Sequence, residues 1–109
     1  MHELGITQNI VAIVSEQSEG RKVLRVKLEI GKLAAIVPDA IRFCFDVCSE
    51  GTVMEGAILE IEEIDGKGTC RLCGKDFPLT IMVGVCPCGS RETLCTAGTE
   101  LNIKEMEVA

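Results

Sequence analysis

The amino-acid sequence predicts an α+β fold, with a small sheet of about three strands, two helices and an inserted domain rich in β-structure. Three observations favour it. Apolar residues recur with helical spacing in two segments, they alternate with polar residues in three others, and two close cysteine pairs precede the last of these. We therefore expect a main domain formed by residues 1–63 and 99–109, interrupted by a second domain at 64–98.

The first predicted elements are a helix and a half-buried strand. The helix is expected from Glu3 to about Ser18, where apolar residues form a wide face, and Gly20 ends it. The strand is expected over 23–30, because apolar and polar residues alternate there. The alternation places Leu24 on the apolar side and Val23 on the polar side.

A second helix is predicted to begin at Pro38, which suits the first turn, and Asp39 beside it complements the helix dipole. Four residues of this helix share one apolar face: Ile41, Cys44, Phe45 and Cys48. Cysteines four positions apart on a helix could in principle chelate a metal. Because free cysteine is among the most buried residue types, we expect Cys44 and Cys48 to pack in the core instead.

The remaining elements are shorter. A second strand is predicted at 57–64, a turn-rich segment at 65–68, and short ribbon elements at 77–80 and 91–96. A last strand is predicted at 101–108. Its apolar residues change parity midway, which predicts a bulge or an edge position.

The strongest chemical signal is a pair of cysteine motifs, Cys70-x-x-Cys73 and Cys86-Pro-Cys88, separated by twelve residues and each followed by glycine. Four thiolates in two close pairs are the ligands of a tetrahedral structural Zn²⁺ site. A single residue separates Cys86 from Cys88, where two are commoner. A site that recruits Cys95 in place of one of the four therefore stays open.

Other classes of protein could use the same cysteines. The glycine-flanked pairs are also typical of rubredoxin-like iron electron carriers, whose ferric tetrathiolate absorbs visible light. A thiol oxidoreductase would place its cysteine pair at a helix start after a buried strand, which the turn-rich flank disfavours. A structural zinc-ribbon adaptor is the third alternative.

The composition of the chain and its lack of certain motifs disfavour several classes of protein. Seventeen acidic and eleven basic residues give a formal charge of −6, and there are three Phe and no Tyr or Trp, which disfavours nucleic-acid binding. No apolar run approaches the ~20 residues that span a bilayer, and no secretory signal opens the chain, so we expect a soluble, cytoplasmic protein. No histidine beyond His2 could activate a cysteine nucleophile, and no enzyme is predicted.

The N-terminus holds a second set of metal donors. His2 is the single histidine of the chain and stands beside the α-amine of Met1. An amine, an imidazole and deprotonated backbone amides suit a square-planar ion such as Ni²⁺ or Cu²⁺. A terminal histidine considered alone, however, is more often simply solvated.

Several segments together resemble a known family. They are Met1-His2-Glu3-Leu4, Val37-Pro38-Asp39-Ala40-Ile41-Arg42-Phe43, Glu50-Gly51-Thr52 with Leu59-Glu60-Ile61, Cys70-x-x-Cys73-Gly74 with Phe77, and Cys86-Pro87 through Gly89-Ser90. The resemblance is to the HypA/HybF family of hydrogenase nickel-incorporation proteins. It implies a small α/β nickel-binding domain with a zinc domain inserted before its final strand.

The resemblance implies a nickel metallochaperone that acts with a HypB-type GTPase and delivers Ni²⁺ to the large-subunit precursor of [NiFe] hydrogenase. The implied nickel ligands are the Met1 amine, the His2 imidazole and amide, and the Glu3 amide, while the Glu3 carboxylate tunes the site or contacts a partner. The implied zinc ligands are the four cysteines Cys70, Cys73, Cys86 and Cys88. A homodimer that shares nickel is left open, as is a role in urease maturation.

Overall fold

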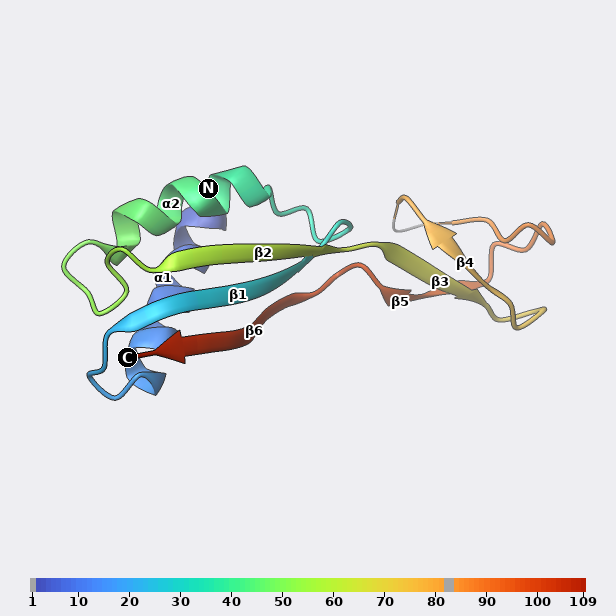
Figure 1. Ribbon diagram of the computed structural model, residues 1–109. Helices are drawn as coiled ribbons and strands as arrows, with labels where there is room; N and C mark the ends of the chain where they lie inside the picture. The colour runs from blue at the N-terminus through green and yellow to red at the C-terminus, as the bar shows by residue number, and fades with distance from the viewer. Residues whose placement is uncertain (1, 82–83) are drawn as a thin grey trace. The chain divides into compact units, whose positions relative to one another are not determined.

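The computed structural model describes residues 2–81 and 84–109, and of His2 it describes the backbone only. Within these residues the elements are α1 (His2–Gln17), β1 (Val23–Gly31), α2 (Pro38–Ser49), β2 (Ile58–Ile64), β3 (Gly66–Cys70), β4 (Asp76–Leu79), β5 (Thr93–Ala97) and β6 (Leu101–Val108) (Figure 1). The strands form two three-stranded sheets, ordered β2-β1-β6 and β4-β3-β5. The predicted α+β class is confirmed, and so is the edge position of the last strand.

The chain divides into two compact units. The helical unit comprises Met1–Glu29, Ile36–Glu62 and Asn102–Ala109, and the ribbon unit comprises Ile30–Ala35 and Glu63–Leu101. The domain boundaries expected from the sequence, between residues 63 and 64 and between residues 98 and 99, stay a prediction. Among the described residues, no helix is long and apolar enough to cross a membrane.

The core of the helical unit lies between the helices and one face of sheet β2-β1-β6. Helix α1 packs against α2, and both lie on the same side of the sheet (Figure 1). Their buried apolar side chains are Ile10, Val11 and Val14 of α1 and Ile41 and Phe45 of α2, together with Val23, Val26 and Leu28 of β1 and Met54. The amphipathic spacing therefore predicts this buried face in part: among the apolar residues of the first helix, Ile13 is 50% exposed.

Strand β1 departs from the predicted alternation at its start. Val23 is fully buried, whereas Leu24 is 43% exposed, so the assignment of these two side chains was wrong. The Val23 N–H donates to the Val53 carbonyl at 2.9 Å, which holds the strand entrance against the loop after α2. Regular alternation begins after Leu24, with Val26 buried between two half-exposed charged residues.

The other face of sheet β2-β1-β6 is covered by ion pairs rather than by protein. Arg25 reaches carboxylates on both neighbouring strands, at 2.5 Å from Glu60 and 3.3 Å from Glu105. Lys104 lies 3.1 Å from Glu62, and its hydrogen bond to that carboxylate is the main reason why the pKa of Glu62 is lowered. Opposite charges on adjacent strands keep this face compatible with water.

Helix α2 ends at Ser49, whose buried hydroxyl is expected to lower the free energy of unfolding. Ser49 is only 3% exposed, and its Oγ has no hydrogen-bond partner among the described atoms. Ser49→Ala is expected to raise the free energy of unfolding by about 1 kcal/mol, because an unsatisfied buried hydroxyl is removed. Ser18→Ala is the matched control, since the equally buried Ser18 Oγ donates to the Ser15 carbonyl at 2.8 Å and its removal should be destabilising. Urea unfolding followed by circular dichroism would contradict the prediction if both changes destabilised equally.

The ribbon unit is built around a strand where the sequence predicted a turn. Residues 66–70 form β3, the central strand of its sheet, which pairs Gly66 with Leu79 and Thr69 with Asp76. The glycine is needed for close packing, not for chain reversal. A Cβ at Gly66 would lie 2.7 Å from Leu33 Cδ1 and would collide with the Leu79 carbonyl.

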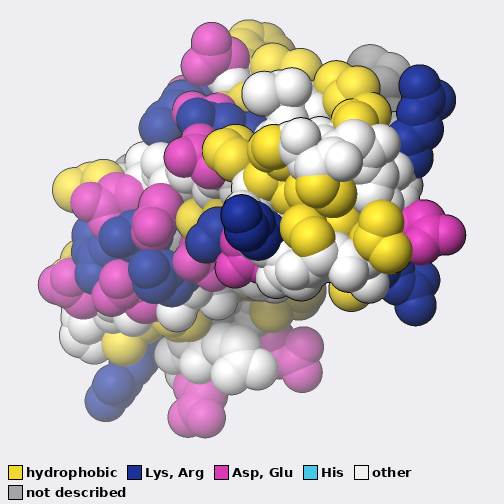
Figure 2. All heavy atoms as spheres, turned by 90° about the vertical axis from the view of Figure 1, so that its right-hand side faces the viewer, with side chains coloured by type: hydrophobic (Ala, Val, Ile, Leu, Met, Phe, Trp, Pro, Cys, Tyr) yellow, Lys and Arg dark blue, Asp and Glu magenta, His cyan; other side chains and the backbone are white. Residues whose placement is uncertain are grey.

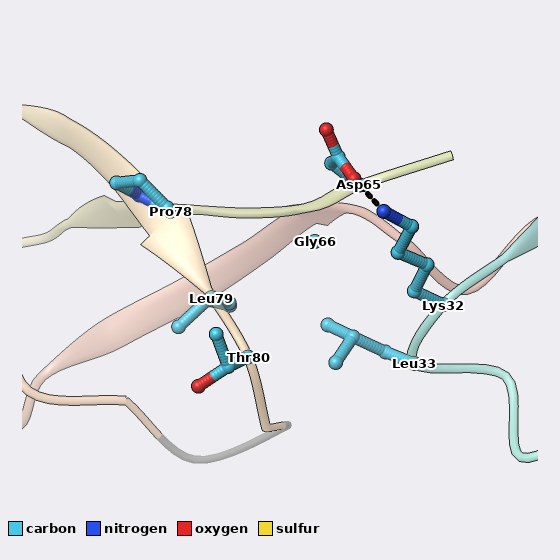
Figure 3. A pocket seen from close by; sticks show the side chains of 7 residues that line it. All are labelled: Lys32, Leu33, Asp65, Gly66, Pro78, Leu79 and Thr80. Atoms are coloured by element: carbon cyan, nitrogen blue, oxygen red, sulfur yellow. Dashed lines mark ion pairs between the residues drawn. The ribbon is translucent and has the colours of Figure 1, made fainter. Parts of the chain in front are cut away.

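Figure 3 shows Leu33, Gly66 and Leu79 around one hollow. Its volume is about 360 Å³. The Lys32 ammonium closes one side by pairing with the Asp65 carboxylate at 2.5 Å, and this contact lowers the pKa of Asp65. The small core of the unit consists of Cys70, Phe77, Leu79 and Cys86, with Leu33 and Cys95 packed against it. Two of the six residues that pack there are therefore also predicted metal ligands.

Candidate metal centre

The first cysteine pair lies on a tight turn at the end of β3. The Gly74 N–H donates to the Cys70 carbonyl at 2.9 Å, and Gly74 has a φ of 76°, a conformation that glycine adopts without strain. The turn brings the Cys73 N–H to 3.4 Å from Cys70 Sγ. A backbone donor therefore stabilises the thiolate form of Cys70, as expected for a metal-binding cysteine turn.

The second pair forms a similar turn despite its shorter spacing. The Gly89 N–H donates to the Cys86 carbonyl at 2.8 Å, with a Gly89 φ of 95°. The Cys88 N–H lies 3.5 Å from Cys86 Sγ. The Cys86 N–H is itself held by the Ser90 carbonyl at 2.9 Å. One intervening residue, Pro87, is therefore enough to turn both thiols to the same side.

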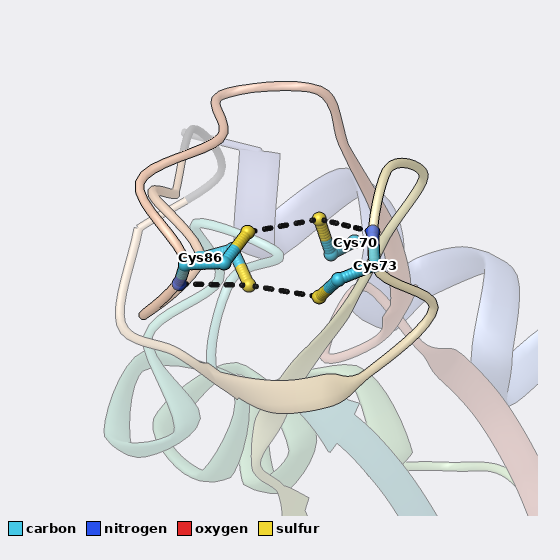
Figure 4. Close-up of side chains that lie close together, drawn as sticks. Cys70, Cys73 and Cys86 are labelled. Atoms are coloured by element: carbon cyan, nitrogen blue, oxygen red, sulfur yellow. Dashed lines mark hydrogen bonds between the residues drawn. The ribbon is translucent and has the colours of Figure 1, made fainter.

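The four sulfurs converge (Figure 4). Their Sγ atoms all lie within 4.8 Å of one another, with 3.7 Å between Cys70 and Cys88 and 3.6 Å between Cys73 and Cys86. Four thiolates around a tetrahedral Zn²⁺, with Zn–S bonds of about 2.3 Å, lie about 3.8 Å apart. The cluster therefore has the size of a tetrathiolate zinc site. Cys70 and Cys86 are buried in it, and Cys73 and Cys88 are exposed.

The thiols in this cluster have unequal acidities. The Cys73 backbone N–H and other hydrogen bonds lower the pKa of Cys70 to about 6. The Cys88 N–H acts in the same direction on Cys86, but burial and the neighbouring thiols raise the pKa of Cys86 to about 12. Four adjacent thiolates repel one another, so a divalent cation is needed to balance them. The donor set thus fits a Zn²⁺ ion.

The other three cysteines lie outside this cluster. Cys44 and Cys48 are half-buried on α2, whereas Ile41 and Phe45 of the same face are buried. The two cysteines therefore pack at the edge of the core, less deeply than the sequence predicted. Burial, and to a smaller extent Cys44, raises the pKa of the Cys48 thiol. Cys95 is half-buried and its thiol donates to the Ala97 carbonyl at 3.3 Å.

The structure describes only part of the predicted nickel site. Met1 and the side chain of His2 lie outside the described residues. Glu3 lies in the first turn of α1, where backbone N–H groups do not take part in the helix's own hydrogen-bond ladder. Its carboxylate accepts a hydrogen bond from the Val37 N–H at 3.3 Å, and its carbonyl accepts one from Thr7 Oγ1 at 2.6 Å.

An apolar hollow of about 370 Å³ lies beside this first turn. It is lined by Glu3, Leu4, Ala40, Phe43, Cys44 and Val47. Phe43 is 73% exposed, and Val47 is exposed as well. This exposed surface of α2 was not predicted from the sequence, in contrast to the buried face of the same helix. The signal was available, because Phe43 and Val47 lie four positions apart and form a second apolar stripe on the helix.

The fold and the cysteine cluster together define a small α+β protein with a zinc-ribbon-like metal-binding unit. The profile of one protein family, described as hydrogenase/urease nickel incorporation, metallochaperone, hypA, matches residues 1–108. The chain belongs to this HypA family of hydrogenase nickel-incorporation metallochaperones. The predicted resemblance is thereby confirmed, and the family is one of metallochaperones and maturation factors.

Relatives and solved structures agree with this assignment. Hydrogenase maturation factor HypA of Trichormus variabilis is 63% identical over 108 residues, which cover 99% of this chain and 96% of the relative. The factor of Geobacter metallireducens is 49% identical over 109 residues, covering 99% of both chains. The solution structure of the Ni metallochaperone HypA from Helicobacter pylori matches with a TM-score of 0.71 and 25% identity, covering 97% of this chain and 96% of that one. Another HypA solution structure matches with a TM-score of 0.73 and 26% identity, covering 100% of this chain and 97% of that one.

Proposed function

We propose that the protein binds Ni²⁺ at its N-terminus in the cytoplasm and delivers it, together with a HypB-type GTPase, to the large-subunit precursor of [NiFe] hydrogenase. The observation that carries this proposal is the family match over residues 1–108, which includes Met1-His2-Glu3 at the start. Nickel is the cargo of this reaction. The protein's task is to hold the ion and to release it to the acceptor.

The nickel ligands are the Met1 amine, the His2 imidazole and amide, and the Glu3 amide. Helix α1 begins at His2, so the amides of His2 and Glu3 lie where the helix does not require their N–H groups for its ladder. Replacing those protons by a metal therefore leaves the helix intact. The Glu3 carboxylate, held by the Val37 N–H, ties this turn to the start of α2. A site at a chain end can rearrange to release its ion with few packing contacts broken.

Zn²⁺ is the resident ion, and Cys70, Cys73, Cys86 and Cys88 are its ligands. The sulfur spacing of 3.6 to 3.7 Å supports this assignment. When bound, zinc cross-links the two cysteine turns and neutralises their thiolates. Because Cys70 and Cys86 also contribute to the core of the ribbon unit, the metal and the core stabilise each other.

Nickel binding by the untagged protein tests the proposal. His2→Ala, and separately an N-terminal extension that blocks the α-amine, are each expected to reduce bound nickel to background, because each removes a ligand from a set of four. Zinc content should not change. The readout is nickel and zinc per chain by plasma emission spectroscopy.

A C-terminal extension of the same length is the matched control and should keep its nickel. A chain with a blocked amino end that still binds a full equivalent of nickel would exclude the terminal site. Loss of nickel from the C-terminally extended chain would mean that the extension itself, not the amine, is responsible.

A further inference from the structure

We infer that the ribbon unit carries a carboxylate-binding site, formed by Arg71 and Arg91, that receives an acidic segment of a partner protein. The two arginines line the same hollow of about 460 Å³, together with Glu92 and Thr93. Both side chains are exposed. Neither arginine is one of the residues proposed to bind zinc or nickel.

The cysteine turns bring the two arginines to one place. Arg71 lies inside the first turn, directly after Cys70, and Arg91 follows the second turn. The Arg71 N–H donates to the Glu92 carbonyl at 2.8 Å, which holds the two segments together. The same folding that gathers the thiols therefore brings both arginines, twenty positions apart in the sequence, to the edge of one hollow.

Neither guanidinium group has an ion-pair or hydrogen-bond partner in the part of the chain that the structure describes. Among the described residues, no carboxylate oxygen lies within 4.0 Å of either one, and neither donates a side-chain hydrogen bond, whereas Arg25, Lys27 and Lys104 each form ion pairs. Glu92 lines the hollow but contributes a single negative charge against two positive ones. The hollow therefore has an excess of one positive charge and free N–H donors.

The charge of the ribbon unit differs from that of the chain as a whole. The whole chain has a formal charge of −6, but the ribbon unit contains five basic and five acidic side chains and is formally neutral. All of the net negative charge belongs to the helical unit. A negatively charged partner segment is therefore repelled less by the ribbon unit, and the arginine hollow attracts it.

Guanidinium forks bind carboxylates and phosphates in the same bidentate geometry. Sites for single-stranded nucleic acid commonly stack bases on aromatic side chains, whereas the one aromatic residue of the ribbon unit, Phe77, is buried in its core. Leu72, next to Arg71, is 72% exposed. Figure 2 shows apolar side chains gathered on the face toward the viewer, with charged side chains of both signs around them. An acidic peptide that also carries apolar side chains fits this surface best.

The inference deepens the proposed function, because it gives the chemistry by which a maturation partner is recognised, and it rests on that function only for the identity of the partner. It requires a folded ribbon unit but no nickel. Nickel binding at the terminus and peptide binding at the hollow can therefore fail independently, and both are measured on the same preparations.

The test selects peptides from a random displayed library on the full-length, zinc-loaded protein. Selected peptides are expected to be enriched in Asp and Glu, and the synthetic consensus peptide is then measured by fluorescence anisotropy. Arg71→Gln with Arg91→Gln should weaken its binding at least about tenfold, because two charge-assisted contacts are lost. Lys67→Gln with Lys75→Gln is the matched control. It removes the same charge from the same unit outside the hollow and should weaken binding less than about threefold.

Other results would overturn the inference. These are peptides without acidic residues, no selected peptides at all, or equal losses in the two double variants. Displacement of the peptide by inorganic phosphate but not by acetate would assign the site to phosphates instead. If the glutamine variant loses zinc, the positive charge of the two arginines is needed to offset the negative charge of the thiolates. Peptide binding is then measured on the Arg71→Lys with Arg91→Lys variant. It keeps the charge but loses the fork, so unchanged peptide affinity in it would also count against the site.

Discussion

Cys86→Ser is expected to abolish stable zinc binding and to unfold the ribbon unit while the helical unit stays folded. Cys86 is both a member of the four-thiol cluster and a buried part of the ribbon core. The substitution therefore removes a ligand and places a hydroxyl in an apolar site. Replacing a residue that hydrogen-bonds to a metal ligand weakens metal binding by up to about 100-fold. Removing the ligand itself should weaken zinc binding more than this. The helical unit has its own buried core, so it is expected to stay folded without the metal.

Zinc per chain and amide resonances in a ¹H–¹⁵N spectrum are the readouts. Resonances of 63–101 should collapse toward unfolded positions, and those of α1 and α2 should persist. Cys95→Ser is the matched control, because Cys95 packs against the same core outside the cluster and should keep its zinc. Retained zinc in Cys86→Ser with loss in Cys95→Ser would show that Cys95 is the fourth ligand. Visible absorbance of the purified protein would indicate iron instead.

Leu28→Ala is expected to lower the free energy of unfolding of the helical unit by about 2–5 kcal/mol. The Leu28 side chain is fully buried on the central strand of its sheet, so its truncation leaves a cavity as well as losing apolar burial. Leu24→Ala, on the same strand, is the matched control. Because Leu24 is 43% exposed, its truncation should change the free energy by only about 0.5 kcal/mol.

Urea unfolding followed by far-ultraviolet circular dichroism measures both variants, with helix signal reporting on the helical unit. The comparison also tests the position at which alternation begins in β1. A cost for Leu24→Ala as large as that for Leu28→Ala would mean that Leu24 points into the core, as the simple alternation predicted.

The elements that the sequence predicts well are those whose signal is local. The start of α2 at Pro38 and the span 101–108 of the last strand agree with the structure residue for residue. In both cases neighbouring residues determine the outcome, through the fixed φ of proline and through alternation within each half of the last strand. Strand β3 was missed because its glycines look like turn residues, and only Leu79 and Leu33 packing on Gly66 reveals their role.

The four-cysteine metal site is indicated by the sequence, whereas the arginine hollow is visible only in the structure. The sequence alone indicates the four cysteines, since metal ligands must come in close pairs that a tight turn can bring together, and it indicates the family through motifs along the whole chain. It does not indicate that Arg71 and Arg91 line the same hollow. Nor does it indicate that the Arg25 guanidinium forms ion pairs with neighbouring strands. Both facts depend on which strands lie next to each other.

The sequence by itself therefore determined the class of the fold, the identity of the candidate ligands and the family. The tertiary structure alone decided which charged side chains are neutralised, that a glycine segment is a central strand, and that four thiols meet at zinc-sized distances. The physical reason is range. Propensity, periodicity and turn chemistry act between near neighbours in the chain, whereas packing, charge pairing and site geometry arise between residues that only folding brings together.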